Sequence, residues 1–123
     1  MTREEILAMQ PGIELNMEVS KEIMGHITNK DEIFGYTERL IDPEDGNSIW
    51  SPVKPYSQDN FAAKLVVEKM IEMGYDDAIY WAKFGDGKYT EPEAICKAAL
   101  LAVLEKLNIK ETSDEILRQA LDD

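Results

Sequence analysis

The stretch TEPEAICKAALLAVLEK, residues 90–106, contains the clearest helix start of the chain and its most apolar run. Thr90 followed three residues later by Glu93 is the pattern of a capping box. Pro92 suits the first turn, where a backbone N–H has no partner within the helix. We therefore expect a core helix here, whose apolar positions cover more than half of its circumference: Ile95, Ala98, Ala99, Leu101, Ala102 and Leu104.

Residues 2–9 are expected to form a short helical turn, and three further segments, at 13–24, 57–73 and 113–121, have the apolar spacing of amphipathic helices. Thr2 and Ser57 are the expected N-caps of the segments at 2–9 and 57–73, because a side-chain oxygen at that position accepts a backbone N–H. Pro11-Gly12, Gly25 and Gly74 are expected to interrupt or end helices. The predicted apolar stripe of the helix at 57–73 is Phe61, Ala62, Leu65, Val66, Met70 and Met73.

The segment DAIYWAKF, residues 77–84, is the best strand candidate, and apolar residues on both of its faces predict a strand covered on both sides. Gly85-Asp86-Gly87 is then expected to be a hairpin turn leading to a short antiparallel strand at 88–90. Residues 32–36 and 47–50 are weaker strand candidates.

These elements predict an α+β fold in which a small antiparallel sheet is sandwiched between helices in α-β-α layers. At 123 residues, the chain is expected to be one domain over residues 1–123, with 109–123 as a C-terminal helical extension. No apolar run approaches the ~20 residues that span a bilayer, and the acidic N-terminus lacks the apolar region of a signal peptide.

The net charge of −12 arises from 25 acidic and 13 basic residues. It argues against a nucleic-acid polymer or an anionic membrane as partner, since both are bound through dense Lys and Arg surfaces. A local pocket for a small anion stays compatible with this charge. Cys96 is the single cysteine; we expect a buried, unreactive thiol in a reducing cytoplasm.

Catalytic and cofactor motifs are absent from the sequence: it contains no GxGxxG, Walker loop, HExxH, CxxC or GxSxG. His26, the single histidine, follows a predicted helix end and is more typical of a structural role than of catalysis or metal binding. The acidic loop at 42–47 lacks the ligand spacing of a calcium loop. We therefore expect a protein that is not an enzyme and has no cofactor or metal.

A ligand site would need stacking surfaces and cations. The aromatic residues Tyr56, Trp81 and Phe84 are candidates for stacking on adenine. Lys54, Lys97 and the helix N-terminus at Thr90 are candidates for phosphate binding. Two alternatives stay open: Trp81 and Phe84 are more typical of a core than of a ligand site, and Lys97 is spaced for an i, i+4 ion pair with Glu93.

Three stretches of the chain resemble the family of small bacteriophage proteins described as phage ABA-sandwich domain proteins. They are PGIELNMEVSKEIMG at 11–25, PYSQDNFAAKLVVEKM at 55–70 and TEPEAICKAALLAVLEK at 90–106. The last is the most specific. Lys97 stands where such proteins commonly carry arginine; a lysine keeps the positive charge but cannot make the bidentate phosphate contact of an arginine. The resemblance implies helix layers around a sheet.

In size, acidity and lack of catalytic groups, the chain is also similar to Thoeris anti-defence sponges of phages. This similarity implies sequestration of a cyclic ADP-ribose-type nucleotide in the host bacterial cytoplasm, without cleavage, by a homo-oligomer that encloses the ligand between protomers. Two other hypotheses are a phage accessory protein acting through protein–protein contacts and, ranked last, a carboxylate-based hydrolase of the same ligands.

Overall fold

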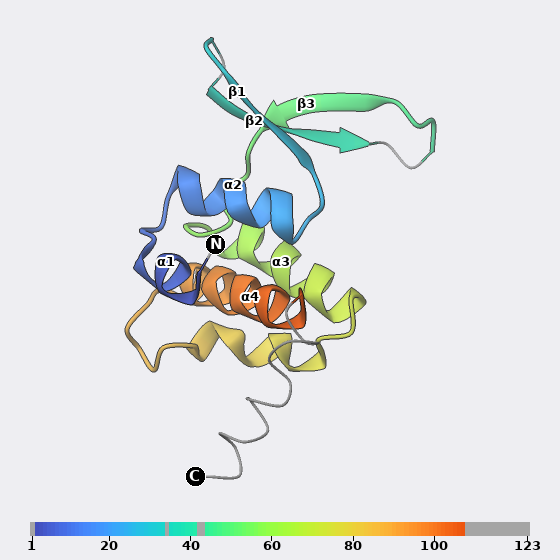
Figure 1. Cartoon of the computed structure of the whole chain (residues 1–123). Coiled ribbons are helices and arrows are strands. Elements are labelled where there is room, and N and C mark those ends of the chain that lie inside the picture. Colours follow the sequence, from blue (N-terminus) through green and yellow to red (C-terminus); the bar gives the residue numbers. More distant parts are fainter. Residues whose placement is uncertain (1, 34, 42–43, 108–123) are drawn as a thin grey trace.

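A computed structural model describes residues 2–33, 35–41 and 44–107 as a helical body with a small sheet at one end (Figure 1). Helix α4 (Glu91–Leu107) runs through the body and contacts all four other helical elements of the described chain. The predicted core helix is therefore confirmed: it begins directly after Thr90, the expected cap, and ends one residue later than expected. Nearly every residue of its first three turns is buried, as their apolar composition requires.

The first two helices begin as the sequence predicts, and the second ends two residues earlier than expected. In α1 (Arg3–Ala8), the Thr2 hydroxyl accepts the backbone N–H of Glu5 at 3.1 Å. After the break at Pro11-Gly12, α2 (Ile13–Glu22) packs on α4 through one face. Gly25 follows with a φ of +73°, a conformation that glycine adopts without the steric cost of a side chain.

Helix α3 (Asn60–Glu72) is correctly predicted as an element, but its cap and its apolar face differ from the expectation. Asp59 is the N-cap, and its carboxylate accepts the N–H of Phe61. Ser57 is instead buried, where its backbone N–H and hydroxyl both donate to the Asn16 side chain. Phe61 and Leu65, expected in the apolar stripe, are exposed. The buried face is rotated to Ala62, Ala63, Val66 and Met70.

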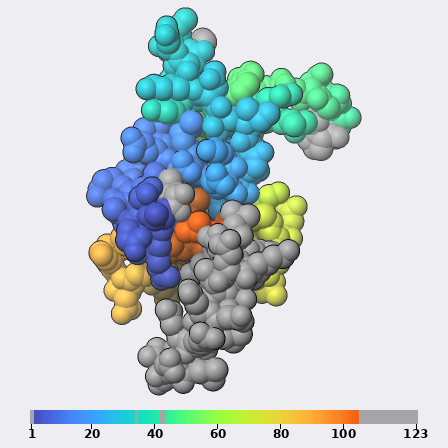
Figure 2. Space-filling model, viewed as in Figure 1, coloured from blue at the N-terminus to red at the C-terminus, as the bar shows by residue number. Residues whose placement is uncertain are grey.

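The sheet contains β1 (Ile27–Asp31), β2 (Gly35–Ile41) and β3 (Ser48–Pro52) in the order β1-β2-β3, and all pairs are antiparallel. The predicted α+β class with a small antiparallel sheet is confirmed. The weak candidate at 47–50 corresponds to β3, whereas the candidate at 32–36 covers turn residues 32–33 and the first two residues of β2. The described helices lie to one side of the sheet, which projects from the body (Figures 1 and 2). Its main helix contacts are with α2.

The strand prediction for DAIYWAKF is wrong. Residues 76–83 form a 3-10 helix, η1 (Asp76–Lys83), that packs against α3 and α4. The cause is that a short apolar run does not distinguish a strand from a helix by period alone, and Asp76 and Asp77 favour a helix start electrostatically. Residues 85–90 form turns and bends, so neither the strand at 88–90 nor a hairpin exists.

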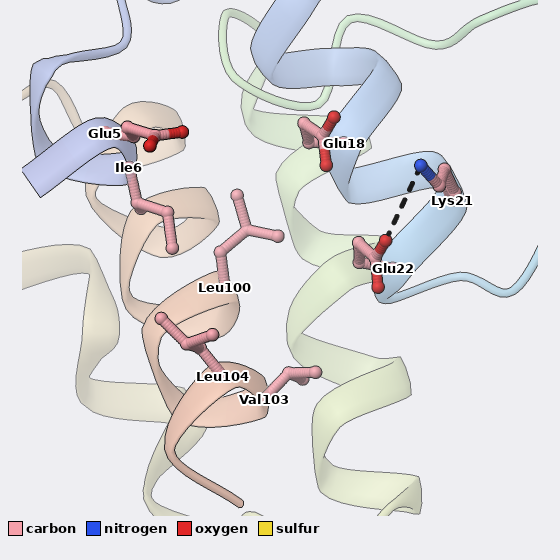
Figure 3. Close-up of a pocket in the computed structure, with 8 residues that line it drawn as sticks. All are labelled: Glu5, Ile6, Glu18, Lys21, Glu22, Leu100, Val103 and Leu104. Atoms are coloured by element: carbon pink, nitrogen blue, oxygen red, sulfur yellow. Dashed lines mark ion pairs between the residues drawn. The ribbon is translucent and has the colours of Figure 1, made fainter. Parts of the chain in front are cut away.

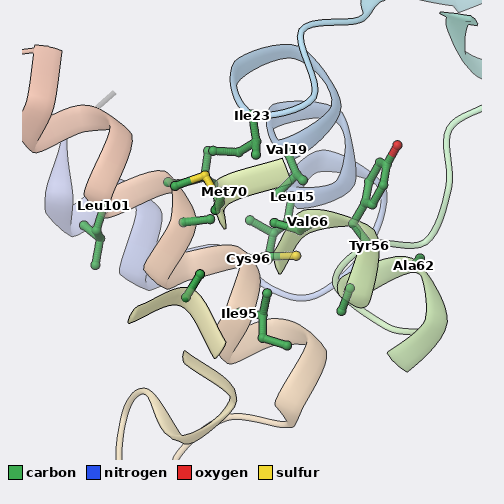
Figure 4. Packing of buried hydrophobic residues seen from close by; sticks show 14 of the residues in the cluster. Leu15, Val19, Ile23, Tyr56, Ala62, Val66, Met70, Ile95, Cys96 and Leu101 are labelled. Atoms are coloured by element: carbon green, nitrogen blue, oxygen red, sulfur yellow. The ribbon is translucent and has the colours of Figure 1, made fainter. Parts of the chain in front are cut away.

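One apolar core joins the helical elements. In Figure 4, Val19 and Ile23 from α2, Val66 and Met70 from α3, and Cys96 from α4 converge on a common interior. Val53 and Tyr56 from the segment after β3 extend this core toward the sheet. No helix within the described ranges is long and apolar enough to cross a bilayer. The predicted helix at 113–121 and the extension at 109–123 lie outside the described residues.

Candidate functional site

The most connected polar group of the described structure is the Glu38 carboxylate, at the centre of β2. Its side chain is 0% exposed. It accepts hydrogen bonds from the Ser20 hydroxyl of α2 at 2.6 Å and from the Tyr56 hydroxyl at 3.1 Å. His26 Nδ1 lies 3.1 Å from Oε2, and Lys54 Nζ lies 3.1 Å from Oε1. We call these five residues the Glu38 cluster; they join the sheet to the helical body.

The electrostatics of the Glu38 cluster favour the charged carboxylate. Burial alone raises the pKa of Glu38, but hydrogen bonds from Ser20, Lys54 and His26 and the positive charge of Lys54 outweigh that effect. The pKa of Glu38 therefore lies below its ordinary value. The pKa of Tyr56 is raised by burial and by the negative charge of Glu38, so Tyr56 stays a neutral donor. The carboxylate is fully enclosed by donors and is not free to accept a proton from a substrate.

Lys54 extends from the Glu38 cluster to the molecular surface. Its side chain is partly exposed, and it lines a shallow hollow of about 410 Å³ together with Pro55 and residues of α3. Phe61, Lys64 and Leu65 contribute to the same hollow because i, i+3 and i+4 positions share a helix face. Phe61 is 84% exposed, which is unusual for an aromatic side chain of this size.

The hollow therefore combines an exposed aromatic ring with two lysines, Lys54 and Lys64, and one acid, Asp59. Lys54 is already paired with the buried Glu38 carboxylate, so Lys64 and Asp59 leave the hollow close to neutral, in contrast with the net charge of −12 of the whole chain. We call Lys54, Phe61 and Lys64 the Phe61 site. Sequence reasoning named Lys54 as a candidate ligand, but it placed Phe61 in the apolar stripe of α3 and did not single out Lys64.

Lys97, a predicted phosphate ligand, is buried, at 2% exposure. Its ammonium is 2.7 Å from the Glu93 carboxylate and donates to the Leu7 carbonyl at 2.9 Å. It also lies 4.2 Å from the centroid of the Tyr89 ring. The alternative i, i+4 ion pair is therefore formed, and Glu93 directs a carboxylate oxygen to Lys97.

The three aromatic candidates occupy different surroundings. Tyr56 is fully buried with its hydroxyl on Glu38, so its ring offers no stacking surface. Trp81 is partly buried against the core and lies 6.1 Å from Tyr75 between ring centroids. Phe84 is stacked on Tyr89 with centroids 6.1 Å apart. Thus Lys54 and Tyr56 both contact Glu38, whereas Phe84 and Lys97 both contact the Tyr89 ring.

Thr90 lines a separate hollow of about 460 Å³ beside Pro11, Gln58 and Asn60. Asn60 and Glu91, the first residues of α3 and α4, line this hollow, so the N-termini of these two helices border it. The Thr90 carbonyl accepts the N–H of Ala94 at 2.8 Å. The predicted helix N-terminus at Thr90 is therefore present, and its hollow shares no lining residue with the hollow of the Phe61 site.

Cys96 and His26, the remaining residues with reactive side chains, are held in the fold by burial and by hydrogen bonds. Burial, together with the charge of Glu93, raises the pKa of Cys96 to about 12, so the reactive thiolate is disfavoured. His26 is held by Ser20 and Glu38. Across residues 2–33, 35–41 and 44–107, no three His, Cys, Asp or Glu side chains come together as a metal ion requires.

No protein-family model matches the chain, and comparisons with curated proteins and with solved structures find no match to it.

Proposed function

We propose that the protein binds a small nucleotide at the Phe61 site and does not cleave it. The observation that carries this proposal is the exposure of Phe61 between Lys54 and Lys64 at the rim of one hollow. An exposed aromatic ring accepts a base by stacking, and lysines bind phosphate oxygens as point charges. The base and the phosphates of one nucleotide can therefore be bound at the same hollow, the base by Phe61 and the phosphates by Lys54 and Lys64.

The Glu38 cluster supports this proposal because it orients Lys54. The Lys54 ammonium is anchored at 3.1 Å from a fully buried carboxylate, which restricts the side chain to the edge of the hollow. A lysine held in this way loses less conformational entropy on binding a phosphate than a free one. Lys64 is exposed on the next turn of α3 from Phe61.

Binding without chemistry is favoured over hydrolysis by the state of the carboxylates. A hydrolase built on carboxylates needs an acid or base within reach of the substrate. Glu38 is enclosed by four donors, and Asp59 accepts the Phe61 N–H as the cap of α3. Both are used in the fold, and a sequestering protein needs neither.

The resemblance of the sequence to phage anti-defence sponges narrows the proposed ligand to a cyclic ADP-ribose-type nucleotide. In this proposal the protein is encoded by a phage, acts in the host bacterial cytoplasm and suppresses Thoeris signalling by removing the nucleotide. The proposal also includes a homo-oligomeric protein, a dimer or a larger assembly. The exposed apolar side chains of the sheet, Ile27, Ile41 and Trp50, support self-association.

The test is an assay of depletion and release. Purified protein is mixed with isomers of cyclic ADP-ribose and filtered, and the retained protein is heated before both fractions are chromatographed. We expect nucleotide to disappear from the filtrate and to return intact on heating. A chemically altered product would identify an enzyme. Nucleotide that stays in the filtrate would exclude this ligand class and favour the function through protein–protein contacts.

A further inference from the structure

A further hollow lies between α1, α2 and α4. Its volume is about 390 Å³. Figure 3 shows Ile6, Leu100, Val103 and Leu104 directed into the space between the helices, with charged side chains along its borders. We call it the α1–α2–α4 groove. Its floor is apolar and shares no residue with the Phe61 site.

The border of this groove is acidic. Glu5 projects from α1, and Glu18 and Glu22 project from α2 (Figure 3). Among the described residues that line the groove, the one cation is Lys21, which lies 3.8 Å from Glu22, so its charge is already partly offset. All three glutamates are exposed or half-exposed, so they are accessible to a partner.

We propose that the α1–α2–α4 groove binds an amphipathic helix with a cationic border, supplied by a protein partner. Grooves between helices accept an apolar helix face whose anchors are spaced at i, i+3 and i+4. The volume of the groove suits two or three such side chains. The acidic border then selects a helix with Lys or Arg flanking its apolar face, because charge complementarity directs encounter and register.

The charges argue against two other occupants. The sixteen residues 108–123 contain five acidic and two basic residues, so this segment would bring negative charge to an acidic border. A second copy of the chain would bring its own net charge of −12. Like charges placed across an interface are unfavourable. A basic helix from another protein is the occupant that the groove complements.

The experiment measures fluorescence anisotropy of a labelled Leu/Lys peptide of about 18 residues, five helical turns, with leucines at i, i+3 and i+4. A peptide of identical composition with scrambled leucines is the reference. We expect the full-length protein to bind the amphipathic peptide at least about tenfold more tightly than the scrambled one. Equal affinity for the two would show general attraction to an acidic surface and would overturn the proposal.

Matched charge reversals locate the binding. Glu18→Lys with Glu22→Lys is expected to lower the affinity about tenfold or more. Glu68→Lys with Glu72→Lys changes the net charge equally on α3, away from the groove, and is expected to leave the affinity within about threefold. Equal losses in both variants would contradict a specific groove.

The floor is tested by Val103→Asn, with circular dichroism confirming that the helices are retained. This substitution is expected to weaken binding of the amphipathic peptide and to leave the scrambled peptide unaffected. Light scattering on the same variant tests the alternative occupant. A wild-type oligomer that becomes a monomer in Val103→Asn would identify a second copy in the groove, and the proposal would be wrong.

Discussion

Lys97 and Glu93 form a buried ion pair on α4, with 2.7 Å between Nζ and Oε2. The same ammonium donates to the Leu7 carbonyl of α1 and lies against the ring of Tyr89. A single cation therefore joins α4 to α1 and to the turn before α4. These contacts assign Lys97 to the fold, whereas the sequence had offered it equally as a phosphate ligand.

Replacing Lys97 with Met is expected to reduce the free energy of unfolding by about 3–5 kcal/mol, because Glu93 is left as an uncompensated buried charge. Urea denaturation at neutral pH measures the loss. Adding Glu93→Gln to Lys97→Met should recover part of it, since the buried charge is then removed. Lys88→Met, at an exposed lysine near the same turn, is the control. Similar losses in the two single variants would contradict a structural role for the pair.

The lowered pKa of Glu38 predicts acid sensitivity. Because the folded-state pKa lies below that of the unfolded chain, about 4.3, the stabilisation is fully present above the unfolded value. It is lost as the pH falls through the folded value. Urea titrations from pH 7 to pH 3 should therefore show a steeper loss of stability in the wild type than in Glu38→Gln.

At pH 7, Glu38→Gln is expected to be less stable by about 1–3 kcal/mol, since the substitution disturbs hydrogen bonds to a buried charged group. The difference between the two proteins should narrow toward pH 3. Glu68→Gln, on the exposed side of α3, is the control and should follow the wild type. A difference that is constant with pH would mean that Glu38 does not titrate with folding.

Much of the helical body was predictable because its signals are local. The Thr2 cap, the Pro11-Gly12 break and the apolar run of α4 each act within a few residues of the chain. The phase of α3 was not predictable in the same way. Its sequence places apolar residues on two adjacent faces, and tertiary packing buries Val66 and Met70 while Phe61 stays outside.

The sheet and the candidate site depend on contacts that no local pattern records. Strand β2 carries Glu38 and Arg39 at its centre, which obscures the alternation of a half-buried strand. Glu38 is acceptable there because Ser20 and Tyr56 reach it from 18 residues away in each direction. Local sequence therefore shows an acid in a polar stretch, and only the fold makes it a buried carboxylate.

The turn before α4 offers a test of close packing. A Cβ added to Gly85 would lie 2.5 Å from Cδ2 of Tyr89, whereas one added to Gly87 would meet nothing within 4 Å. Both glycines have positive φ, at +83° and +90°. Both alanine variants therefore incur backbone strain of about 1–2 kcal/mol, and Gly85→Ala must also displace Tyr89.

We expect the melting temperature to fall further for Gly85→Ala than for Gly87→Ala, and the difference isolates the contact with Tyr89. In a Tyr89→Ala background, where the clashing ring is absent, Gly85→Ala and Gly87→Ala should lower the melting temperature by similar amounts. Equal melting temperatures for the two single variants would show that Tyr89 is not held against Gly85.

The burial of Cys96 predicts that its thiol is protected in the native protein. With a pKa of about 12 and no exposed surface, it should react with a thiol reagent at pH 8 only through unfolding. Labelling followed by mass spectrometry should show slow modification in buffer and complete modification of one site in concentrated urea. Rapid labelling without denaturant would mean that this part of the core opens locally.

Phe61 gives the sharpest separation of binding from stability. Its ring is 84% exposed, so Phe61→Ala should change the free energy of unfolding by no more than about 0.5 kcal/mol. Affinity for cyclic ADP-ribose, measured by calorimetry, should fall by about 1–3 kcal/mol, because the base loses its stacking surface. Tyr80→Ala removes another exposed aromatic side chain, on η1, and should leave the affinity unchanged.

Lys64→Gln distinguishes the phosphate contact of the Phe61 site from its contact with the base. It should weaken binding of the nucleotide, while weak binding of adenosine, which lacks phosphate, should be the same as in the wild type. Lys88→Gln makes the same change of charge at an exposed lysine outside the hollow and is the control. If Lys64→Gln and Lys88→Gln weaken the nucleotide equally, the phosphates respond to overall charge and the Phe61 site does not bind them. If Phe61→Ala and Tyr80→Ala also behave alike, the ligand lies elsewhere on the protein.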